Sequence, residues 1–337
     1  MTVATAPATW YAIVGNSDYY WRVNAPARAV GAETCLIPET GGWYDVTEPN
    51  QDSEFVWTQD EDGLTTYPNH QGAAVWVRPD LARATHAKAM RDLHGVFTVA
   101  ETDDNYLAPA QHNIYMRSNG FDAKLRLDHM KAMASMNRMV FSTGWLRDYY
   151  FKELKRQFGK GRLPDMAVCR NHVFEDDWPI VEDYDGPVRV GWMGSPSHIW
   201  DVNLAWPALL WASRAGARTF MVGYDPANPE NKVTSEKARA TVEQWEKVGY
   251  ETVPWRQMDG TTRLRLPFDI GLAPLVTNAF TLGKSDIKAI EYAISGAAPV
   301  LQNNAVFNRD WKHGETCLMA GSPSEMIDAV KRLMVDH

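Results

Sequence analysis

The first half of the chain alternates short apolar runs with segments in which apolar residues recur every three to four positions. The short runs predict β-strands, because they are rich in β-branched and aromatic residues and end at glycine or polar residues. They lie at 10–14, 73–77, 96–100 and 138–141. Helical spacing occurs at 22–30, 79–93, 130–136 and 143–158. Strands that alternate with helices predict a parallel sheet covered on both faces.

The same alternation starts again after a polar, acidic break at 171–187, which contains two prolines and a glycine and therefore predicts a linker. Beyond it, strands are predicted at 188–192, 219–222, 251–253, 268–272, 298–301 and 316–319. Helices are predicted at 201–214, 234–248, 285–295 and 324–335. Ligands of such open sheets bind beyond the carboxyl ends of the strands, so two units place the natural site in the cleft between them.

The predicted fold class is therefore α/β, with two doubly wound, Rossmann-like domains that face a cleft. We expect an N-terminal domain at 1–170, the linker at 171–187 and a C-terminal domain at 188–337. The last helix of the C-terminal domain is free to pack back on the N-terminal one.

Composition narrows the class of protein. The chain has 337 residues, of which 45% are hydrophobic and 23% charged, so it can bury a core and is not globally disordered. It has no apolar run long enough to span a membrane, and its first ten residues lack the pattern of a signal peptide. The three cysteines, Cys35, Cys169 and Cys317, have neither metal-binding spacing nor the even number of a disulfide framework. We expect a cytoplasmic protein without a membrane span or a disulfide partner.

The net charge of −8 disfavours a generic polyanion binder, and it is unevenly distributed. Residues 29–77 contain no lysine or arginine, whereas nine acidic residues lie there, so the rest of the chain carries a net charge of +1. One interpretation is a solvated acidic loop. The other is an acidic rim on the acceptor side that repels nucleic acid.

A glycine-rich turn follows the first predicted strand of the second half and precedes a helix. Gly194, Ser195 and His198 lie in this turn, at 191–198. Glycines there allow backbone N–H groups to approach an anion, and the N-terminus of a helix favours negative charge. The turn matches neither the dinucleotide-binding fingerprint nor a P-loop, and by itself a tight strand-to-helix connection explains it equally well.

A second candidate anion site lies where the helix at 285–295 begins. Lys284 and Ser285 stand at its start, where a diphosphate would be stabilised. Lys284, Lys288 and Glu291 are spaced i, i+4, i+7, which predicts that they share one helical face. The alternative for Lys288 and Glu291 is an ordinary surface ion pair.

The stretch at 291–300, Glu-Tyr-Ala-Ile-Ser-Gly-Ala-Ala-Pro-Val, resembles the donor-binding signature of B-fold glycosyltransferases of family 4 (group 1). The resemblance covers most of 165–335 and is nearest to divergent bacterial or bacteriophage members. It implies that Glu291 binds the ribose hydroxyls of a nucleotide sugar. It also implies that the turn at 191–195 faces the diphosphate and that Trp255 stacks on the nucleobase.

The sequence departs from this family in two places. The family has a second glutamate eight positions before the helical one, where this chain has Gly283; Asn278 or Asp286 would have to replace it. The arginine and lysine that hold the diphosphate are not in their usual places either. The available cations are then His198, Lys284 and Lys288, with Lys284 as the first choice.

Two polar clusters in the first half follow predicted strands. Tyr20 and Arg22 follow the first strand, where such enzymes place acceptor or sugar contacts. Glu101, Asp103 and Asp104 follow the strand that ends at residue 100 and resemble a Glu-x-Asp-Asp stretch of the same divergent members. We therefore assign Tyr20, Arg22 and Glu101 to the acceptor side, and catalysis to Asp103, Asp104 and Lys284.

Asp103 leaves other interpretations open. With Asn105 it has the spacing of a metal site of A-fold transferases, although those lack a second doubly wound unit. It could also serve as a helix cap or a loop residue.

The resemblance implies a hexosyl- or related transferase that moves a sugar from a UDP- or GDP-sugar to an acceptor hydroxyl. It implies retention at the anomeric carbon, no metal and no cofactor, with a protein, glycan or lipid acceptor favoured over nucleic acid. A nucleotide-sugar epimerase on the same architecture and a non-catalytic nucleotide-sugar-binding protein are the alternatives. The absence of a nucleophile elbow argues against a serine hydrolase.

Overall fold

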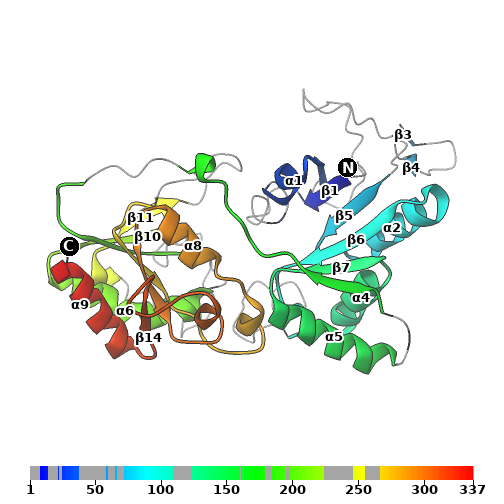
Figure 1. Cartoon of the computed structure of the whole chain (residues 1–337). Helices are drawn as coiled ribbons and strands as arrows, with labels where there is room; N and C mark the ends of the chain where they lie inside the picture. Colours follow the sequence, from blue (N-terminus) through cyan, green and yellow to red (C-terminus); the bar gives the residue numbers. More distant parts are fainter. Residues whose placement is uncertain are drawn as a thin grey trace. The chain divides into compact units, whose positions relative to one another are not determined.

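A computed structural model shows the fold of the chain in two units, described here one at a time (Figure 1). It describes residues 8–13, 22, 25–37, 58–59, 65–66, 72–108, 123–159, 161, 163–178, 184–194, 198–223, 246–254 and 266–336. The chain passes from the first unit to the second after Val173, within the segment 171–187. None of the described helices is long and apolar enough to cross a membrane.

The first unit is built on a six-stranded parallel sheet with the order β2-β1-β5-β6-β7-β8. Its strands are β1 (Ala8–Ile13), β2 (Glu33–Ile37), β5 (Ala73–Val77), β6 (Phe97–Thr102), β7 (Arg138–Phe141) and β8 (Asp165–Val168). Its helices are α1 (Ala25–Val30), α2 (Leu81–His94), α4 (Ala123–Ala134) and α5 (Gly144–Phe158). A separate antiparallel pair joins β3 (Thr58–Gln59) to β4 (Thr65–Thr66). The strand order reverses between β1 and β5, as expected of a doubly wound sheet.

Local sequence signals delimit the helices of this unit. The Asp80 carboxylate accepts a hydrogen bond of 2.8 Å from the backbone N–H of Arg83 and so begins α2. Gly95 ends α2 in the left-handed conformation, with φ +69°, which favours glycine. The side chain of Thr143 caps α5 in the same way as Asp80 caps α2. The buried faces of α2, α4 and α5 share one apolar core with alternate residues of β5, β6 and β7, among them Trp76 and Phe141.

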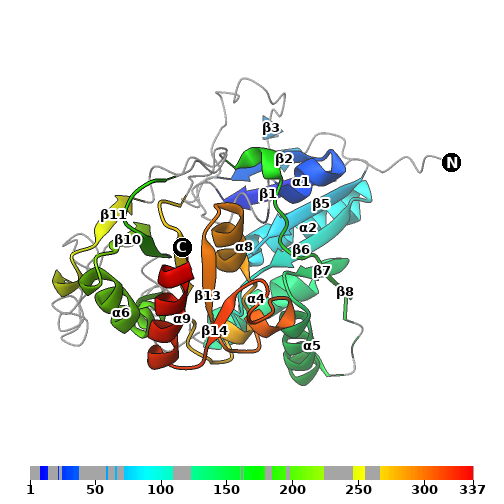
Figure 2. The same cartoon turned by 60° about the vertical axis from the view of Figure 1, so that its left-hand side comes forward.

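The second unit contains another six-stranded parallel sheet, with the order β11-β10-β9-β12-β13-β14. Its strands β10, β11, β13 and β14 are labelled in Figure 2. Its strands are β9 (Arg189–Met193), β10 (Arg218–Gly223), β11 (Glu251–Pro254), β12 (Ile270–Ala273), β13 (Ala298–Gln302) and β14 (Leu318–Ala320). Its α-helices are α6 (Ile199–Arg214), α8 (Ile287–Ile294) and α9 (Pro323–Asp336), and its 3₁₀ turns are η4 (Glu246–Val248), η6 (Thr281–Gly283) and η7 (Phe307–Arg309). The order reverses between β9 and β12, which makes their carboxyl ends the place where a ligand is expected.

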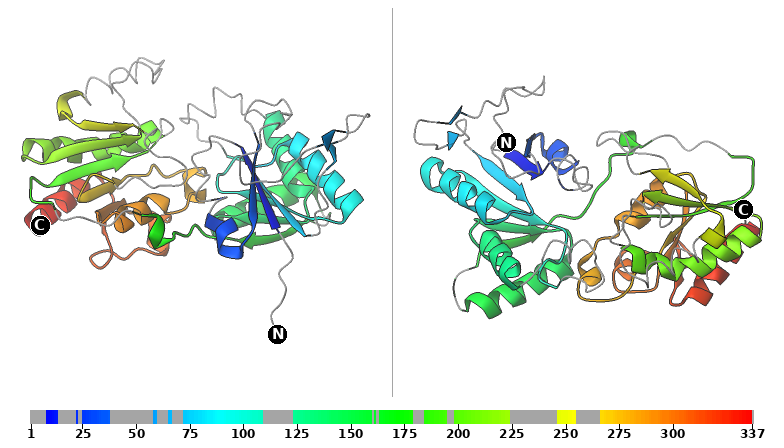
Figure 3. Two further views of the ribbon diagram at one scale, coloured as in Figure 1. Left: turned by 90° about the horizontal axis from the view of Figure 1, so that it is seen from above. Right: turned by 180° about the vertical axis from the view of Figure 1, so that it is seen from behind.

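Alternation along these strands separates two apolar cores, one on each face of the sheet. The ribbon of this unit has helices on both faces of the sheet (Figure 3). Val190 and Trp192 of β9 belong to the core that contains the buried residues of α6 and α9. The next residue, Met193, belongs to the core that contains Ala289 and Tyr292 of α8. The same alternation runs through the other central strands, because successive side chains of a strand point to opposite faces.

The α/β class and the two Rossmann-like sheets are confirmed, and the predicted strands at 73–77 and 138–141 have the observed bounds. The strands β2 and β8, which form the two edges of the first sheet, were not predicted from the sequence. The β8 strand is short: its apolar residues are Met166, Ala167 and Val168, and none of them is fully buried. The helix expected at 130–136 begins at Ala123. The last helix, α9, packs on α6 and beside β14, within the second unit.

Two predicted features, the helix at 234–248 and the acidic window at 29–77, lie only partly within the described residues. Of the helix expected at 234–248, the described part is the 3₁₀ turn η4. The acidic window at 29–77 lies mostly outside the described residues.

Candidate functional site

The two central strands of the second sheet separate at their carboxyl ends. β9 and β12 are paired at Val190–Ile270 and Gly191–Gly271. Beyond this register the hydroxyl of Tyr292 bridges them: it donates to the Leu272 carbonyl at 2.9 Å and accepts from the Met193 N–H at 3.2 Å. The point where the strand order reverses is therefore held open by a buried tyrosine of α8.

Glycines let aromatic rings of this unit lie directly against the two strands. A Cβ on Gly271 would lie 2.5 Å from the Tyr292 ring, and one on Gly191 would overlap the ring of Phe268. The two rings meet edge to face, with centroids 5.4 Å apart. This close packing fixes α8 beside the carboxyl ends of β9 and β12.

Lys288, in the first turn of α8, reaches this open end. Its Nζ lies 4.9 Å from the centroid of the Trp192 ring and 3.2 Å from where a Cβ on Gly194 would be. The Nζ atom is buried, and it has no hydrogen-bond partner among the described residues. Burial lowers the pKa of Lys288 to about 8, helped by the charge of Lys284 and opposed by two carboxylates. A buried ammonium without a partner is costly, so this position favours an anionic ligand.

A histidine and an aspartate stand at the start of α6, after the turn that follows β9. The Nδ1 atom of His198 lies 2.6 Å from Oδ2 of Asp201, and Oδ1 of Asp201 accepts a hydrogen bond of 2.7 Å from the Val276 N–H. Burial, and next the charge of Lys288, lower the pKa of His198 to about 4. Burial alone would raise the pKa of Asp201, but the contacts with His198, Lys288 and Val276 hold it below its usual value. The histidine is therefore neutral, and its partner is charged.

The remaining donor-side candidates of this unit have varied surroundings. Asn278 shapes the turn after β12, since its Oδ1 accepts hydrogen bonds from the backbone of Phe280 and Thr281. Lys284 and Ser285 precede α8, and the Nζ of Lys284 lies 4.7 Å from the centroid of the Phe280 ring. Glu291 lies on α8 and is buried.

Two expectations about this segment were wrong. Lys284 lies outside the helix, in extended backbone, so helical spacing does not place it on a face with Lys288. Lys288 and Glu291 do not form an ordinary surface pair, because Glu291 and the Nζ of Lys288 are both buried. Ser195 and Trp255 lie outside the described residues.

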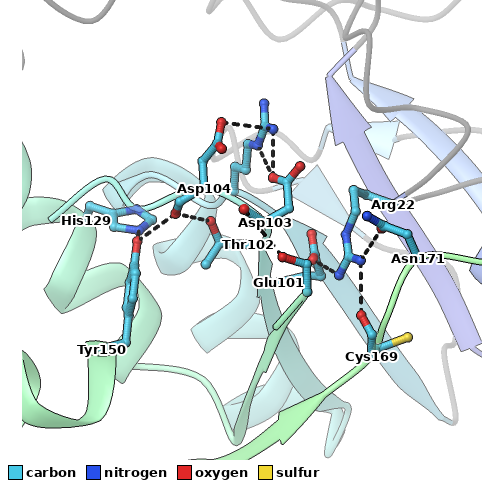
Figure 4. Close-up of polar contacts among 11 residues, drawn as sticks. Arg22, Glu101, Thr102, Asp103, Asp104, His129, Tyr150, Cys169 and Asn171 are labelled. Atoms are coloured by element: carbon cyan, nitrogen blue, oxygen red, sulfur yellow. Dashed lines mark hydrogen bonds and ion pairs between the residues drawn. The ribbon is translucent and has the colours of Figure 1, made fainter. Parts of the chain in front are cut away.

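A second polar cluster occupies the carboxyl edge of the sheet in the first unit (Figure 4). Arg22 is 1% exposed and forms an ion pair with Glu101, which is 3% exposed. The same guanidinium donates to Oδ1 of Asn171 at 2.8 Å and to the Cys169 carbonyl at 3.1 Å. Burial, opposed by Arg22 and reinforced by Asp103, raises the pKa of Glu101 to about 7. The pKa of Arg22 is raised as well: burial lowers it, but Glu101 and Asp103 outweigh that effect.

Arg78, directly after β5, holds both aspartates predicted to be catalytic. Its Nε and Nη2 donate to Oδ1 of Asp103 at 2.9 and 2.7 Å, and Nη2 lies 3.6 Å from Oδ2 of Asp104. Among the described residues, Arg78 is the only non-glycine with a positive φ, +50°, a strained conformation of the kind found at functional sites. Its backbone N–H donates to the Glu101 carbonyl at 2.7 Å, which ties it to the Arg22 cluster.

The alternatives for Asp103 can now be compared with its contacts. The Asp103 carboxylate lies in the loop directly after β6 and accepts hydrogen bonds from Nε and Nη2 of Arg78. The oxygen of Asn105, its partner in the proposed metal spacing, accepts from the Leu107 N–H at 3.2 Å. No group of three or more His, Cys, Asp or Glu residues in the described part of the chain has a geometry that could hold a metal ion.

A buried hydrogen-bonded pair supports the loop after β6 from the other side. His129 Nε2 lies 2.9 Å from the hydroxyl of Tyr150, and that hydroxyl donates to the Asp104 carbonyl at 3.3 Å (Figure 4). Burial lowers the pKa of His129 to about 4, so it remains neutral. His129 thus has a structural role in fixing the loop that carries the aspartates.

The structure brings the candidates together in two groups. Arg22, Glu101, Asp103 and Asp104 share the network of the first unit, whereas Gly194, His198 and Lys288 meet in the second. Tyr20 lies outside the described residues.

Three residues that organise these groups, Asp201, Arg78 and Trp192, were not among the candidates predicted from the sequence. Asp201 follows His198 by three positions in the first turn of a helix, and Arg78 follows a strand directly; both spacings could have revealed them. Trp192 gave no such signal, because a tryptophan in a strand is usually a core residue.

Comparison with known proteins shows relationships of fold. No family model matches the chain, and no curated protein matches it in sequence. HepE of Anabaena, solved in complex with UDP and glucose, matches with TM-score 0.58 and 7% identity over 97% of this chain and 90% of that chain. The catalytic domain of starch synthase IV from Arabidopsis thaliana, bound to ADP and acarbose, matches with TM-score 0.58 and 10% identity over 99% and 92%.

A UDP-forming trehalose-phosphate synthase from Burkholderia vietnamiensis is matched over less of its length, 66% of that chain and 77% of this one, with TM-score 0.49 and 12% identity. The chain has the fold of the B-type glycosyltransferases, with two Rossmann-like domains.

Proposed function

We propose that this protein is a glycosyltransferase that transfers a sugar from a nucleotide diphosphate sugar to an acceptor hydroxyl. The observation that carries the proposal is the buried Nζ of Lys288, without a partner among the described residues, at the end of β9. The fold adds support, because ligands of doubly wound sheets bind where the strand order reverses. HepE and starch synthase IV, which share the fold, were solved with UDP and with ADP.

In this proposal Lys288 binds the diphosphate and stabilises the negative charge that develops on it as the sugar leaves. Gly194 lets the phosphate approach, since a side chain there would collide with Trp192 and lie 3.2 Å from the Nζ of Lys288. The N-terminus of α6 follows the turn that contains Gly194, and in this proposal its backbone N–H groups also bind the phosphate. Such preorganised positive charge is the main source of catalysis when the leaving group is an anion.

The other donor-side residues take the roles that the family resemblance implies. Glu291 binds the ribose hydroxyls, and Lys284, Ser285 and Asn278 line the approach to the diphosphate. We prefer Lys288 to Lys284 as the main cation, because the Nζ of Lys288 is buried and has no hydrogen-bond partner among the described residues.

The reaction is proposed to proceed with retention at the anomeric carbon and without a metal. Lys288 and the start of α6 then supply the positive charge that a metal supplies in other transferases. In the first unit, Asp103 and Asp104 are held in place by Arg78 and take part on the side of the reacting sugar and its acceptor.

The proposal is tested by calorimetric titration with UDP-, ADP- and GDP-glucose, followed by an assay for released nucleoside diphosphate. We expect Lys288→Ala to weaken binding of the preferred donor by roughly 10- to 100-fold, since a charge-assisted hydrogen bond contributes about 1.5–3 kcal/mol. Lys331→Ala is a matched control, because the Nζ of Lys331 also lies near a tryptophan ring, 5.5 Å from the centroid of Trp211, but is exposed on α9.

The expected result is a selective loss in Lys288→Ala, with Lys331→Ala indistinguishable from the wild type. Failure of all three nucleotide sugars to bind the wild type would overturn the proposal. Release of the free nucleoside diphosphate distinguishes transfer from epimerisation, which leaves the nucleotide attached to the sugar.

A further inference from the structure

His198 and Asp201 form a hydrogen-bonded pair near Lys288, and the proposed function gives this pair no role. We propose that His198 is a proton-linked ligand of the donor: when the diphosphate binds, its imidazole takes a proton from solvent on Nε2, and the resulting imidazolium donates a hydrogen bond to a phosphate oxygen. The inference rests on the proposed function, and it adds a second cation, which exists only in the complex.

The hydrogen bonds of Asp201 determine the state of the histidine before the ligand arrives. Asp201 is 5% exposed and charged, so it can only accept hydrogen bonds, and Nδ1 of His198 must therefore carry the hydrogen. The neutral ring then has its lone pair on Nε2. Since Val276 fixes the other oxygen of the same carboxylate, the ring is held in one orientation.

The charges around His198 come from three elements. Asp201 lies on α6, Lys288 on α8, and Lys284 just before α8; the aspartate favours a proton on the imidazole and both lysines oppose it. Beyond them, Glu291 acts on Lys288 from the same helix. Among these described groups two cations face two carboxylates, so the site has no surplus positive charge to match a diphosphate.

Binding of a diphosphate reverses the balance at His198. Its negative charge offsets the two lysines, which disfavour protonation, and it attracts a proton to Nε2. Asp201 is already bonded to Nδ1, so the imidazolium needs no rearrangement to be stabilised. In the free protein, burial and the two lysines hold the pKa of His198 at about 4. In the complex this pKa rises. At any pH between the pKa of the free protein and the pKa of the complex, donor binding therefore takes up one proton.

The test is calorimetry with UDP-glucose at about pH 6, in two buffers that differ in ionisation enthalpy, which counts the protons taken up. UDP-glucose is a suitable probe because its diphosphate is esterified at both ends and does not itself titrate near neutral pH. We expect the wild type to take up on the order of one proton, and its affinity to rise as the pH falls from about 8 to about 6. If UDP-glucose is not the preferred donor, ADP- or GDP-glucose is used in the same way.

His198→Gln keeps a hydrogen-bonding side chain but cannot take up this proton. It is expected to abolish the uptake and to weaken binding roughly tenfold at about pH 6, with a smaller loss at about pH 8. Asp201→Asn removes the charge that stabilises the imidazolium. It is therefore also expected to reduce the number of protons taken up when the donor binds. His313→Gln is the control, since His313 is exposed and accepts a hydrogen bond from the Met319 N–H, and it should retain the wild-type uptake.

NMR titration of the His198 ring, free and saturated with the same ligand, gives a second measurement that does not depend on the variants. A pKa that rises on binding supports the inference. Donor binding with the same proton uptake in the wild type and in His198→Gln, or an unchanged pKa of the ring, overturns the inference and leaves the proposed function standing. Absence of binding by every nucleotide sugar overturns both.

Discussion

The two polar clusters of this protein are built on similar sheets but differ in how their charges are matched. In the first unit, the Arg22 and Arg78 guanidinium groups each pair with a carboxylate, and both pairs are largely buried. In the second unit, the buried Nζ of Lys288 lacks a hydrogen-bond partner among the described residues, and His198 is kept neutral beside its aspartate. The guanidinium groups of the first cluster are hydrogen-bonded to carboxylates, whereas the ammonium of Lys288 is bonded to none of the described carboxylates near it.

This difference separates positioning from binding. A buried ion pair of this kind holds its side chains in one geometry, and each charge already has a partner of opposite sign, although burial still raises the pKa of Glu101. An unmatched buried cation is destabilising until an anion arrives, so its electrostatic energy is available for binding. We therefore propose that the network of Arg22 and Arg78 preorganises the loop after β6, and that the Lys288 site binds the diphosphate. The predictions below test this contrast.

The largest effect is expected for Arg22→Met. Loss of the Arg22 guanidinium would leave Glu101 buried without its counter-ion. It would also remove the hydrogen bonds that the guanidinium donates to Asn171 and to the Cys169 carbonyl. Breaking a buried ion pair in this way costs roughly 3–5 kcal/mol of the free energy of unfolding. Urea denaturation at about pH 8 measures it, under conditions where Glu101 is charged in the wild type.

Arg156→Met, on α5 of the same unit, is the matched control. Its ion pair with Glu153 is exposed, so its removal should change the free energy of unfolding by at most about 0.5 kcal/mol. Equal losses in the two variants would show that the Arg22 pair is no more important than a surface pair, and the contrast between the two clusters would then fail.

A somewhat smaller effect is expected in the pH dependence of stability. The pKa of Glu101 is raised from 4.5 in the unfolded chain to about 7 in the folded one, so the folded state binds this proton more tightly. Its contribution to stability is complete below about pH 4.5 and is lost as the pH rises to about 7, a difference of roughly 3 kcal/mol. Glu101→Gln should remove this part of the pH profile.

The measurement is the free energy of unfolding of both proteins across that pH range. The wild type should lose up to roughly 3 kcal/mol of stability relative to Glu101→Gln as the pH rises from about 4.5 to about 7. Glu153→Gln, in the exposed pair on α5, should follow the wild-type profile. Parallel profiles for the wild type and Glu101→Gln would show that Glu101 does not titrate in this window.

The sequence predicted the alternation of strands and helices well, because buried strands such as β5 and β7 are continuous apolar runs with polar ends. It also located the strand ends where polar side chains gather. Which charges are matched could not be predicted in this way. Arg22 and Asn171 are far apart in sequence, and only the packing of the strands brings them within 2.8 Å of each other.

The choice between lysines shows the same limit. Lys284 and Lys288 are equivalent in a helical repeat, but the helix begins at Ile287 and only Lys288 belongs to it. Whether a lysine is satisfied depends on its tertiary surroundings: Phe280 beneath one ammonium, Trp192 and a glycine turn beside the other. Sequence periodicity carries no information about such contacts.

The smallest effect is expected in donor affinity at alkaline pH. Burial lowers the pKa of Lys288 to about 8, so above this pH the free protein loses the charge that the diphosphate requires, and binding must restore the proton. The affinity of the wild type for its donor, UDP-glucose or whichever nucleotide sugar binds best, should fall by up to roughly tenfold between about pH 8 and about pH 9. Lys288→Arg should show a flat profile in this range even if its absolute affinity is lower, because arginine keeps its charge. Lys331→Arg should show the wild-type decline, since the exposed ammonium of Lys331 lies on α9.

If the decline persisted in Lys288→Arg, another group would be the titrating cation, and the unmatched charge of the second unit would lie elsewhere. A flat wild-type profile would show that the Lys288 ammonium keeps its proton without the donor. A decline confined to proteins with a lysine at position 288 would separate this alkaline limb from the acidic limb expected of His198.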